Sequence, residues 1–205
     1  MQKRGLLIAA IILFSALLAW MAFFWQPGAV PHGQRAGVAG LAEAPRGGDF
    51  TLRSAQGPLS LRDLRGKVVL LYFGYTLCPD ICPTSLAFTA QGLSQMTAEE
   101  QEKVRMLFVT VDPERDTLER LKEYTVFFHP NITGLTGTRA EIAGVAAQYG
   151  ASYARQQVES AAGYVVDHSA DTYVIAPDGR FFAALPHATP PGKVVETIQA
   201  ALAAR

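Results

Sequence analysis

Residues 67–83 read KVVLLYFGYTLCPDICP, and this stretch decides the fold. Residues 67–75 form a continuous run of β-branched, aliphatic and aromatic side chains, which is typical of a strand buried on both faces. Pro83 then suits the first turn of a helix, and Leu86 and Leu93 give that helix an apolar stripe. A buried strand followed by a helix begins a β–α–β unit, so we expect an α/β fold.

Similar patterns continue along the chain to its end. A hairpin is predicted over 49–61, further strands over 104–111, 171–176 and 180–185, and further helices over about 118–128, 138–149 and from 191 onward. Strands that alternate with helices and end in an antiparallel hairpin predict a central sheet flanked by helices. In such a sheet both cysteines lie just beyond the carboxyl end of a central strand, where open α/β folds bind ligands.

The N-terminus has the composition of a membrane anchor. Residues 1–4 carry two positive charges, and residues 5–25 are apolar apart from Ser15. At about 1.5 Å of rise per residue, such a helix crosses the roughly 30 Å hydrocarbon core of a bilayer. The positive charges predict that 1–4 form a cytoplasmic tip and that the rest of the chain lies across the membrane.

Two other kinds of N-terminal segment fit less well. A cleaved signal peptide has an apolar core of about 7–15 residues and small residues at its cleavage site, whereas Phe23, Phe24 and Trp25 occupy that place here. Four residues before the span leave no room for an organelle transit peptide, so we expect the bacterial inner membrane with the C-terminal domain in the periplasm.

The remainder divides into a linker and one domain. Residues 26–48 are rich in proline and glycine and predict a flexible linker. Residues 49–205 suffice for one domain with a sizeable core. The 18 Lys and Arg residues equal the 18 Asp and Glu residues and form no basic block, so nucleic-acid binding has no electrostatic support.

Cys78 and Cys82 are the two cysteines of the chain. At the start of a helix their spacing allows a dithiol or a disulfide, since Cα atoms can lie within the roughly 4.4–6.8 Å that a disulfide needs. A disulfide that closes so short a loop would stabilise the fold little, whereas a helix N-terminus favours the thiolate, the nucleophilic and metal-binding form. A thiol–disulfide oxidoreductase and a metal carrier both stay open; a peroxidase is disfavoured because no thiol-activating threonine and arginine pair stands at a convincing spacing.

A third ligand would distinguish the two functions, and His168 is the candidate because we expect it in a loop near the cysteines, just before the strand 171–176. The other histidines have simpler explanations, His32 as a solvated side chain of the linker, His187 as an inert loop residue and His129 as a charge at a helix end. Two thiolates and an imidazole suit Cu(I) and can hold Cu(II). Structural zinc would want a fourth ligand, which Asp167 or His187 could supply, so zinc stays open.

Three carboxylates are candidates for supporting the ligands without touching the metal. They are Asp167, Asp80 and Asp112. The block 111–117, VDPERDT, is otherwise expected to be a structural turn, in which Arg115 pairs with a neighbouring carboxylate.

Four segments make the chain resemble the Sco/SenC family of copper-binding assembly factors for cytochrome c oxidase. They are GYTLCPDICPTSL at 74–86, FVTVDPERDT at 108–117, ITGLTGT at 132–138 and DHSADTYVIAPDGRF at 167–181. The segments occur in the family's order and cover nearly the whole of 49–205. The resemblance implies a thioredoxin-like fold, membrane attachment and copper ligation by Cys78, Cys82 and His168. It also implies action on the CuA centre of oxidase subunit II, either by delivering copper or by reducing its cysteines.

We therefore expect a membrane-anchored copper metallochaperone rather than a classical enzyme, with cytochrome c oxidase subunit II as the acceptor. A disulfide has no thiolate for metal, so loading would require a thioredoxin-like reductant that opens a redox-active Cys78–Cys82 disulfide, and a periplasmic copper donor. The alternative is a periplasmic thiol–disulfide oxidoreductase that reduces the cysteines of subunit II, with Cys78 or Cys82 as the attacking thiolate.

Overall fold

The computed structural model describes residues 45–157 and 163–204, and near the N-terminus Gly5, 13–15, 17, 18 and Trp20. The chain separates into two units, 1–41 and 42–205. The described residues of the first unit are helical, and the rest of the predicted anchor (5–25) and residues 26–44 of the predicted linker lie outside the described residues. Within the described part, no helix has the length and apolar character needed to cross a membrane.

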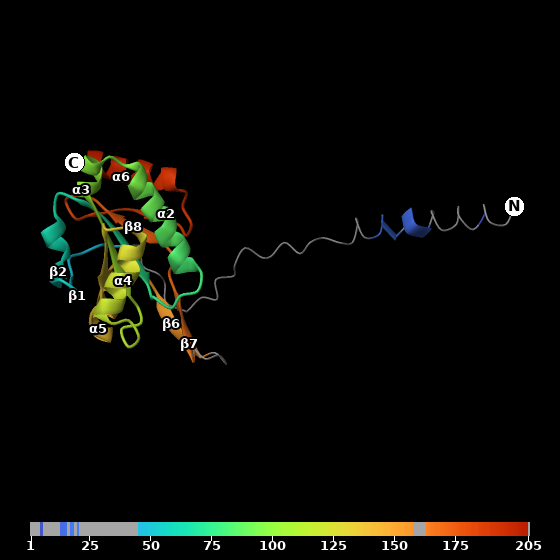
Figure 1. Cartoon of the computed structure of the whole chain (residues 1–205), viewed down its shortest axis with the longest axis horizontal. Helices are drawn as coiled ribbons and strands as arrows, with labels where there is room; N and C mark the ends of the chain where they lie inside the picture. Colours follow the sequence, from blue (N-terminus) through green and yellow to red (C-terminus); the bar gives the residue numbers. More distant parts are fainter. Residues whose placement is uncertain are drawn as a thin grey trace. The chain divides into compact units, whose positions relative to one another are not determined.

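The second unit is a mixed α/β fold (Figure 1). Its strands are β1 (Thr51–Ser54), β2 (Gly57–Ser60), β3 (Val68–Gly74), β4 (Val104–Thr110), β5 (Ile132–Leu135), β6 (Tyr153–Gln157), β7 (Tyr164–His168), β8 (Thr172–Ile175) and β9 (Phe181–Leu185). Its helices are the 3-10 turn η1 (Leu61–Leu64) and α2 (Ile81–Gln95), α3 (Ala98–Glu102), α4 (Leu118–Phe128), α5 (Arg139–Gln148) and α6 (Pro191–Ala203).

A five-stranded sheet in the order β5-β4-β3-β8-β9 forms the centre of this unit. β3 pairs in parallel with β4, and β4 with β5, whereas β8 pairs antiparallel with β3 and with β9. Every residue of β3 is buried, as its unbroken apolar sequence predicts. β3 is therefore the central strand, and its carboxyl end opens directly into the cysteine-bearing segment.

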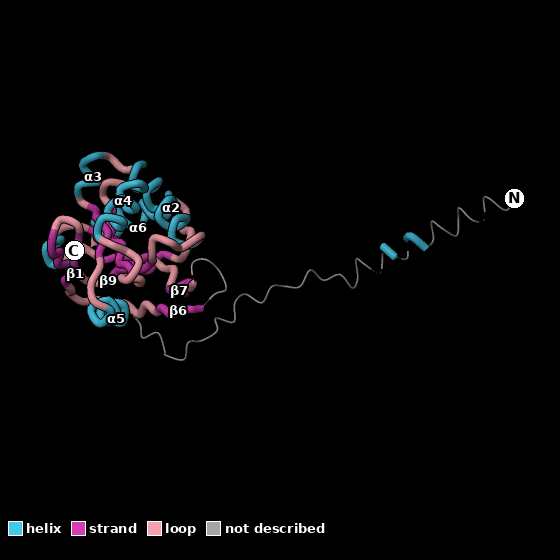
Figure 2. The backbone as a smooth tube through the Cα atoms, turned by 60° about the horizontal axis from the view of Figure 1, so that its bottom comes forward, coloured by secondary structure: helices cyan, strands magenta, loops and turns pink. Residues whose placement is uncertain are grey.

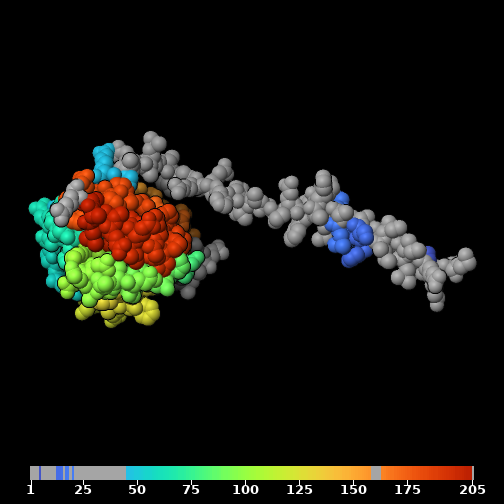
Figure 3. Space-filling model, turned by 90° about the horizontal axis from the view of Figure 1, so that it is seen from above, coloured from blue at the N-terminus to red at the C-terminus, as the bar shows by residue number. Residues whose placement is uncertain are grey.

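Helices cover both faces of the sheet. Figure 2 shows α2, α4 and α6 on one side of the strands and α5 on the other. α6 packs beside α2, and it forms much of the face seen in Figure 3. The absence of a side chain at Gly92 permits this packing, because a Cβ there would lie 3.1 Å from the carbonyl oxygen of Pro191 and 3.3 Å from Cβ of Val194.

The predicted class, a central sheet flanked by helices, is confirmed, and so are the hairpin over 49–61 and the predicted strands and helices of the main sheet. The placement of Pro83 in the first turn of a helix is also confirmed, because α2 begins at Ile81. Cys82 is therefore the second residue of the helix. The sequence analysis did not predict the short elements α3 and β5.

The two-stranded sheet of β6 and β7 was also not predicted, and it corrects the position of His168. The strands are antiparallel and pair Tyr153 with His168 and Arg155 with Val166. We expected His168 in a loop, but it is the last residue of β7. A strand fixes the direction of a side chain through its two-residue alternation, so His168 is held more firmly than a loop residue would be.

Candidate metal centre

The two cysteines lie where β3 ends and α2 begins. Cys78 belongs to the loop 75–80 and is 9% exposed, whereas Cys82 lies in the first turn of α2 and is fully buried. Both are free thiols in this structure. The loop turns back on itself through a hydrogen bond from the amide of Cys78 to the carbonyl of Tyr75. Both sulfurs therefore lie on one side of the loop, at the edge of the core.

Gly74, the last residue of β3, provides the space that the buried sulfur occupies. A Cβ at this position would lie 2.7 Å from Sγ of Cys82 and 2.9 Å from a ring carbon of Phe108. Real side chains do not tolerate contacts this short, so the sulfur of Cys82 occupies space that a larger residue would fill. The GYTLCPDICP motif thus needs its glycine for the position of a thiol.

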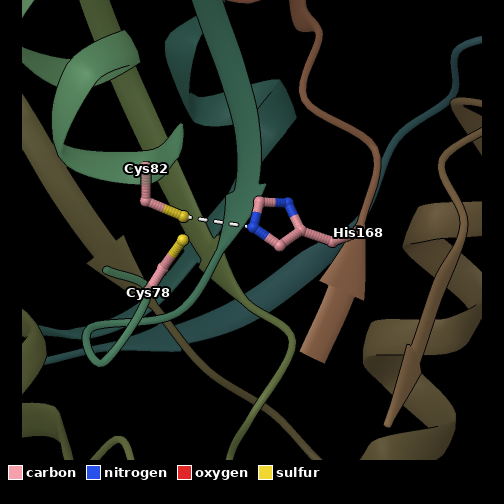
Figure 4. A group of neighbouring side chains, drawn as sticks. All are labelled: Cys78, Cys82 and His168. Atoms are coloured by element: carbon pink, nitrogen blue, oxygen red, sulfur yellow. Dashed lines mark hydrogen bonds between the residues drawn. The ribbon is translucent and has the colours of Figure 1, made fainter. Parts of the chain in front are cut away.

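His168 completes the group from the opposite side, as Figure 4 shows. Its Nε2 lies 3.2 Å from Sγ of Cys82, and its Nδ1 lies 2.9 Å from the carbonyl oxygen of Ser169. A carbonyl oxygen can only accept a hydrogen bond, so Nδ1 carries the proton and donates a hydrogen bond to Ser169. Nε2 then presents its lone pair to the sulfurs, which is the tautomer that a metal-binding histidine requires.

The three side chains therefore offer a compact set of soft donors. One ligand atom from each of Cys78, Cys82 and His168 lies within 4.8 Å of the other two. Two thiolates and one imidazole at this spacing could surround a single ion, and the softness of sulfur favours copper in its reduced state. Among the described residues, this is the one group of at least three cysteine, histidine or acidic side chains close enough for a metal.

The two thiols share one proton unequally. A hydrogen bond donated by Cys82 lowers the pKa of Cys78 to about 3, outweighing the effect of burial, with the amides of Asp80 and Cys82 adding to the same effect. Burial and the neighbouring thiolate raise the pKa of Cys82 above its ordinary value. Near neutral pH the pair consequently holds a thiolate at the more accessible Cys78 and a thiol at Cys82.

Aromatic rings shield the group from water. Tyr72 and Tyr75 each approach the ring of His168 edge-on, with centroid distances of 6.1 and 5.9 Å. Burial, with the nearby thiolate of Cys78 as a smaller cause, raises the pKa of Tyr72, so its phenol stays neutral. Apolar surroundings of this kind restrict solvent access and disfavour bound water at a metal.

Asp116 fastens the cysteine loop to the neighbouring β4–α4 loop. This buried carboxylate accepts hydrogen bonds from the amide of Thr76 at 3.1 Å, from its hydroxyl at 2.6 Å and from the hydroxyl of Thr110 at 2.6 Å. The sequence analysis read VDPERDT as a structural turn and did not single out Asp116 or Thr76 for the site. Charged residues in a block that follows a buried strand were the available signal.

The three predicted supporting carboxylates occupy different places. Asp80 precedes α2 as its N-cap residue and lies at the surface, and its amide hydrogen-bonds Cys78. Asp112 is fully buried but binds Arg115 and the hydroxyl of Tyr164 rather than a donor of the site. Asp167 is exposed, and the alternation of β7 directs it to the face opposite His168.

The remaining predicted histidines within the described part stay away from the donor group. Nδ1 of His187 lies 2.9 Å from the hydroxyl of Ser85, one turn of α2 beyond Cys82. His129 is buried at the end of α4, where its Nδ1 accepts the amide of Asn131 and burial lowers its pKa. The expectation that His129 carries a charge at a helix end was therefore wrong, because both effects favour the neutral ring.

Comparisons with known proteins agree with this geometry. The sequence matches the family model described as SCO1/SenC over residues 39–203. It is 36% identical to the mouse (Mus musculus) protein named "Protein SCO2 homolog, mitochondrial" over 205 residues, covering 98% of this chain and 80% of that protein.

Two solved structures with copper bound are also similar. ScoI of Bradyrhizobium japonicum is 36% identical with a TM-score of 0.69, covering 76% of this chain and 98% of that one. Yeast Sco1 is 34% identical with a TM-score of 0.70, covering 78% of this chain and 90% of that one.

Proposed function

Because this chain belongs to the SCO1/SenC family, we propose that it is a copper metallochaperone, which holds one copper ion through Cys78, Cys82 and His168 and passes it to an assembling cytochrome c oxidase. The family's expected thioredoxin-like fold is consistent with the observed sheet flanked by helices. The observation that carries the proposal is the convergence of two thiols and one imidazole from segments far apart in sequence.

The donor set suits a carrier better than a permanent metal site. Three ligands leave a copper ion open to an incoming fourth ligand, so an acceptor can bind the ion before the carrier releases it. Cys78 lies in a loop and is 9% exposed, whereas Cys82 and His168 are fixed by a helix and a strand. Ligand exchange would consequently begin at Cys78.

The proposal includes a place and a set of partners. Residues 5–25 anchor the chain in a bacterial inner membrane, with 1–4 in the cytoplasm, and 26–48 connect the anchor to a periplasmic domain beginning at 49. The acceptor is the CuA centre of cytochrome c oxidase subunit II. A periplasmic donor supplies copper, and a thioredoxin-like reductant keeps the Cys78–Cys82 pair reduced.

An anaerobic Cu(I) competition titration of the reduced full chain in detergent tests the proposal. We expect one tightly bound copper per chain, weaker binding in His168→Ala and none in the Cys78→Ala, Cys82→Ala double variant. Oxidation of the pair with diamide should abolish binding as well, since a disulfide has no thiolate. Weak binding that is indifferent to His168 would contradict the carrier function.

A second candidate is a thiol–disulfide reductase, favoured by the lowered pKa of the accessible Cys78 thiol. The Cys78 thiolate would attack one sulfur of a substrate disulfide and release the other sulfur as a thiolate. Cys82, after losing its proton to that leaving thiolate, would attack the mixed disulfide. The substrate is thereby reduced by two electrons and the Cys78–Cys82 disulfide forms, which the thioredoxin-like reductant then reduces.

His168 separates the two functions. A reductase needs both cysteines but no imidazole, so reduction of a model peptide disulfide at an unchanged rate in His168→Ala, together with weak copper binding, would favour the reductase. Loss of tight copper binding in that variant without any disulfide reduction by the wild type would favour the carrier.

A further inference from the structure

A cluster of charged side chains surrounds Tyr164, at the end of β7 opposite His168. The ring of Tyr164 lies between two guanidinium groups, with the central carbon of Arg115 at 3.7 Å and that of Arg155 at 3.9 Å from its centroid. Its hydroxyl donates a hydrogen bond of 2.8 Å to buried Asp112, and its carbonyl accepts one of 3.1 Å from Arg115. Tyr164 is therefore held on both ring faces, at its tip and at its backbone.

The same carboxylate ties the arginines together. Asp112 accepts a hydrogen bond from Arg115 and lies 3.6 Å from a guanidinium nitrogen of Arg155. Glu114 adds a salt bridge of 2.9 Å to Arg155. Arg155 belongs to β6, Tyr164 to β7, and Asp112 and Arg115 to the β4–α4 loop. This arrangement therefore fixes the β6–β7 sheet to the main body of the domain.

The spacing along β7 connects this cluster to the donor group. Tyr164 and His168 are four residues apart in a strand, so their side chains share one face and lie about 13 Å apart. Between them, the amide of Val166 donates a hydrogen bond of 3.4 Å to the hydroxyl of Tyr75, which belongs to the cysteine loop. A paired strand does not stretch, and fixing one end limits the position of the other.

The β4–α4 loop also holds the cysteines. Asp116 in this loop binds Thr76 of the cysteine loop, while Asp112 and Arg115 bind Tyr164 of β7. The cysteine loop and β7, which carries His168, are therefore both bound to one short segment, residues 110–117. The distance between the cysteine loop and β7 then depends on that segment.

We propose that Asp112, Arg115, Arg155 and Tyr164 form a latch that positions His168 against the two cysteines and thereby sets the affinity for copper. The inference rests on the proposed function. None of the four residues touches the donor atoms, so all four are positioning residues. Without the latch, β7 would retain its pairing with β6 while the pair moved as a unit, carrying the imidazole away from Sγ of Cys82.

A double-mutant comparison in the full chain in detergent tests the latch. Partners that orient a metal ligand typically contribute a factor of about 10–100 in affinity, so we expect Tyr164→Ala to weaken Cu(I) binding at least tenfold. In the His168→Ala background the same substitution should change affinity little, because the ligand that the latch positions is already absent. An equal loss in both backgrounds would overturn the latch.

Glu114 offers a matched control. Arg155 and Arg139 both pair with Glu114, but only Arg155 stacks on Tyr164. Arg155→Met should therefore weaken copper binding, whereas Arg139→Met should leave it unchanged. Equal effects of the two substitutions would assign the loss to surface charge and overturn the latch.

A measurement without copper keeps the test independent of the proposed function. Hydrogen exchange of the reduced, metal-free chain, followed by mass spectrometry, should show faster exchange over 163–169 in Tyr164→Ala and unchanged exchange over β3. Tyr164→Phe, which keeps the ring and loses the bond to Asp112, should be intermediate and serves if the alanine variant does not fold. Unchanged exchange over 163–169 overturns the latch, whereas absent copper binding by the wild type overturns the proposed function alone.

Discussion

Gly74 shows how one residue can determine the position of a ligand. Gly74→Ala places a methyl group 2.7 Å from Sγ of Cys82 and 3.0 Å from the ring of Tyr72. Because the core is closely packed, we expect a loss of about 1–3 kcal/mol in the free energy of unfolding. We also expect weaker copper binding, since the sulfur must move. Urea denaturation and Cu(I) competition measure the two effects.

Gly144→Ala in α5 is the control for that prediction. Nothing lies within 4 Å of a Cβ at Gly144, and alanine favours a helix over glycine by roughly 1 kcal/mol. This substitution should stabilise the protein and leave copper affinity as it was. If Gly74→Ala were equally harmless, the space beside Cys82 would not determine the position of the sulfur.

The unequal sharing of one proton by the thiols predicts the pH dependence of copper binding. Cys78, with a pKa lowered to about 3, is already a thiolate at neutral pH, whereas burial keeps Cys82 protonated. Binding to both sulfurs should therefore release one proton, and affinity should rise about tenfold per pH unit. A pH-stat titration between pH 7.5 and 8.5 counts the protons; two per copper would contradict this sharing.

The β4–α4 loop connects the segments that carry the donor atoms. Asp116 links the β4–α4 loop to the cysteine loop, since while buried it accepts two hydrogen bonds from Thr76 and a third from Thr110 of β4. Asp116→Ala leaves three donors without their acceptor, so we expect a loss of roughly 3 kcal/mol in the free energy of unfolding. Thermal or urea denaturation measures it.

The exposed carboxylate of Asp178 provides the comparison for Asp116. It binds Arg180 in the turn between β8 and β9, and Asp178→Ala should change stability too little to measure. Similar losses in the free energy of unfolding for the two alanine variants would show that the hydrogen bonds of Asp116 to Thr76 contribute no more to stability than an exposed ion pair.

Elements whose stability depends on local pattern were predictable, and those that depend on distant contacts were not. The runs at β3 and β4 are apolar throughout, which predicts buried strands. By contrast, β6 reads YARQQ, which has no buried residue. Its contacts run through Arg155 to Tyr164 and Asp112, residues that sequence separates by at least nine positions. No periodic pattern records such contacts.

The three side chains of the candidate site could be named from the sequence, but the elements and contacts that hold them could not. The spacing of Cys78 and Cys82 allowed a dithiol or a disulfide, and the place of His168 in the chain, together with the resemblance, made it the candidate third ligand. The sequence did not indicate that His168 ends a strand, or that Ser169 accepts its Nδ1 proton. Both facts depend on how the chain returns to the cysteine loop, and that return is a property of tertiary structure.

At the scale of the whole molecule, a bound copper ion would connect the cysteine-bearing segment to β7 and so stabilise the folded state. A ligand present at about 100 times its dissociation constant stabilises the folded state by roughly 2.7 kcal/mol, which for a domain of this size corresponds to about 5–10 °C in Tm. We expect such an increase in reduced protein by calorimetry under anaerobic conditions. The Cys78→Ala, Cys82→Ala variant should show none, and an equal increase there would mean that copper binds elsewhere.

The separation of the donors along the chain has a consequence for biosynthesis. His168 follows Cys82 by 86 residues, so at about 5–20 residues per second the ribosome adds both thiols roughly 4–17 s before it adds the imidazole. During that interval the nascent chain has two reactive sulfurs and neither the histidine nor the latch. Premature metal capture or oxidation would therefore occur at an unfinished site, and correct loading has to wait until translation has passed β7.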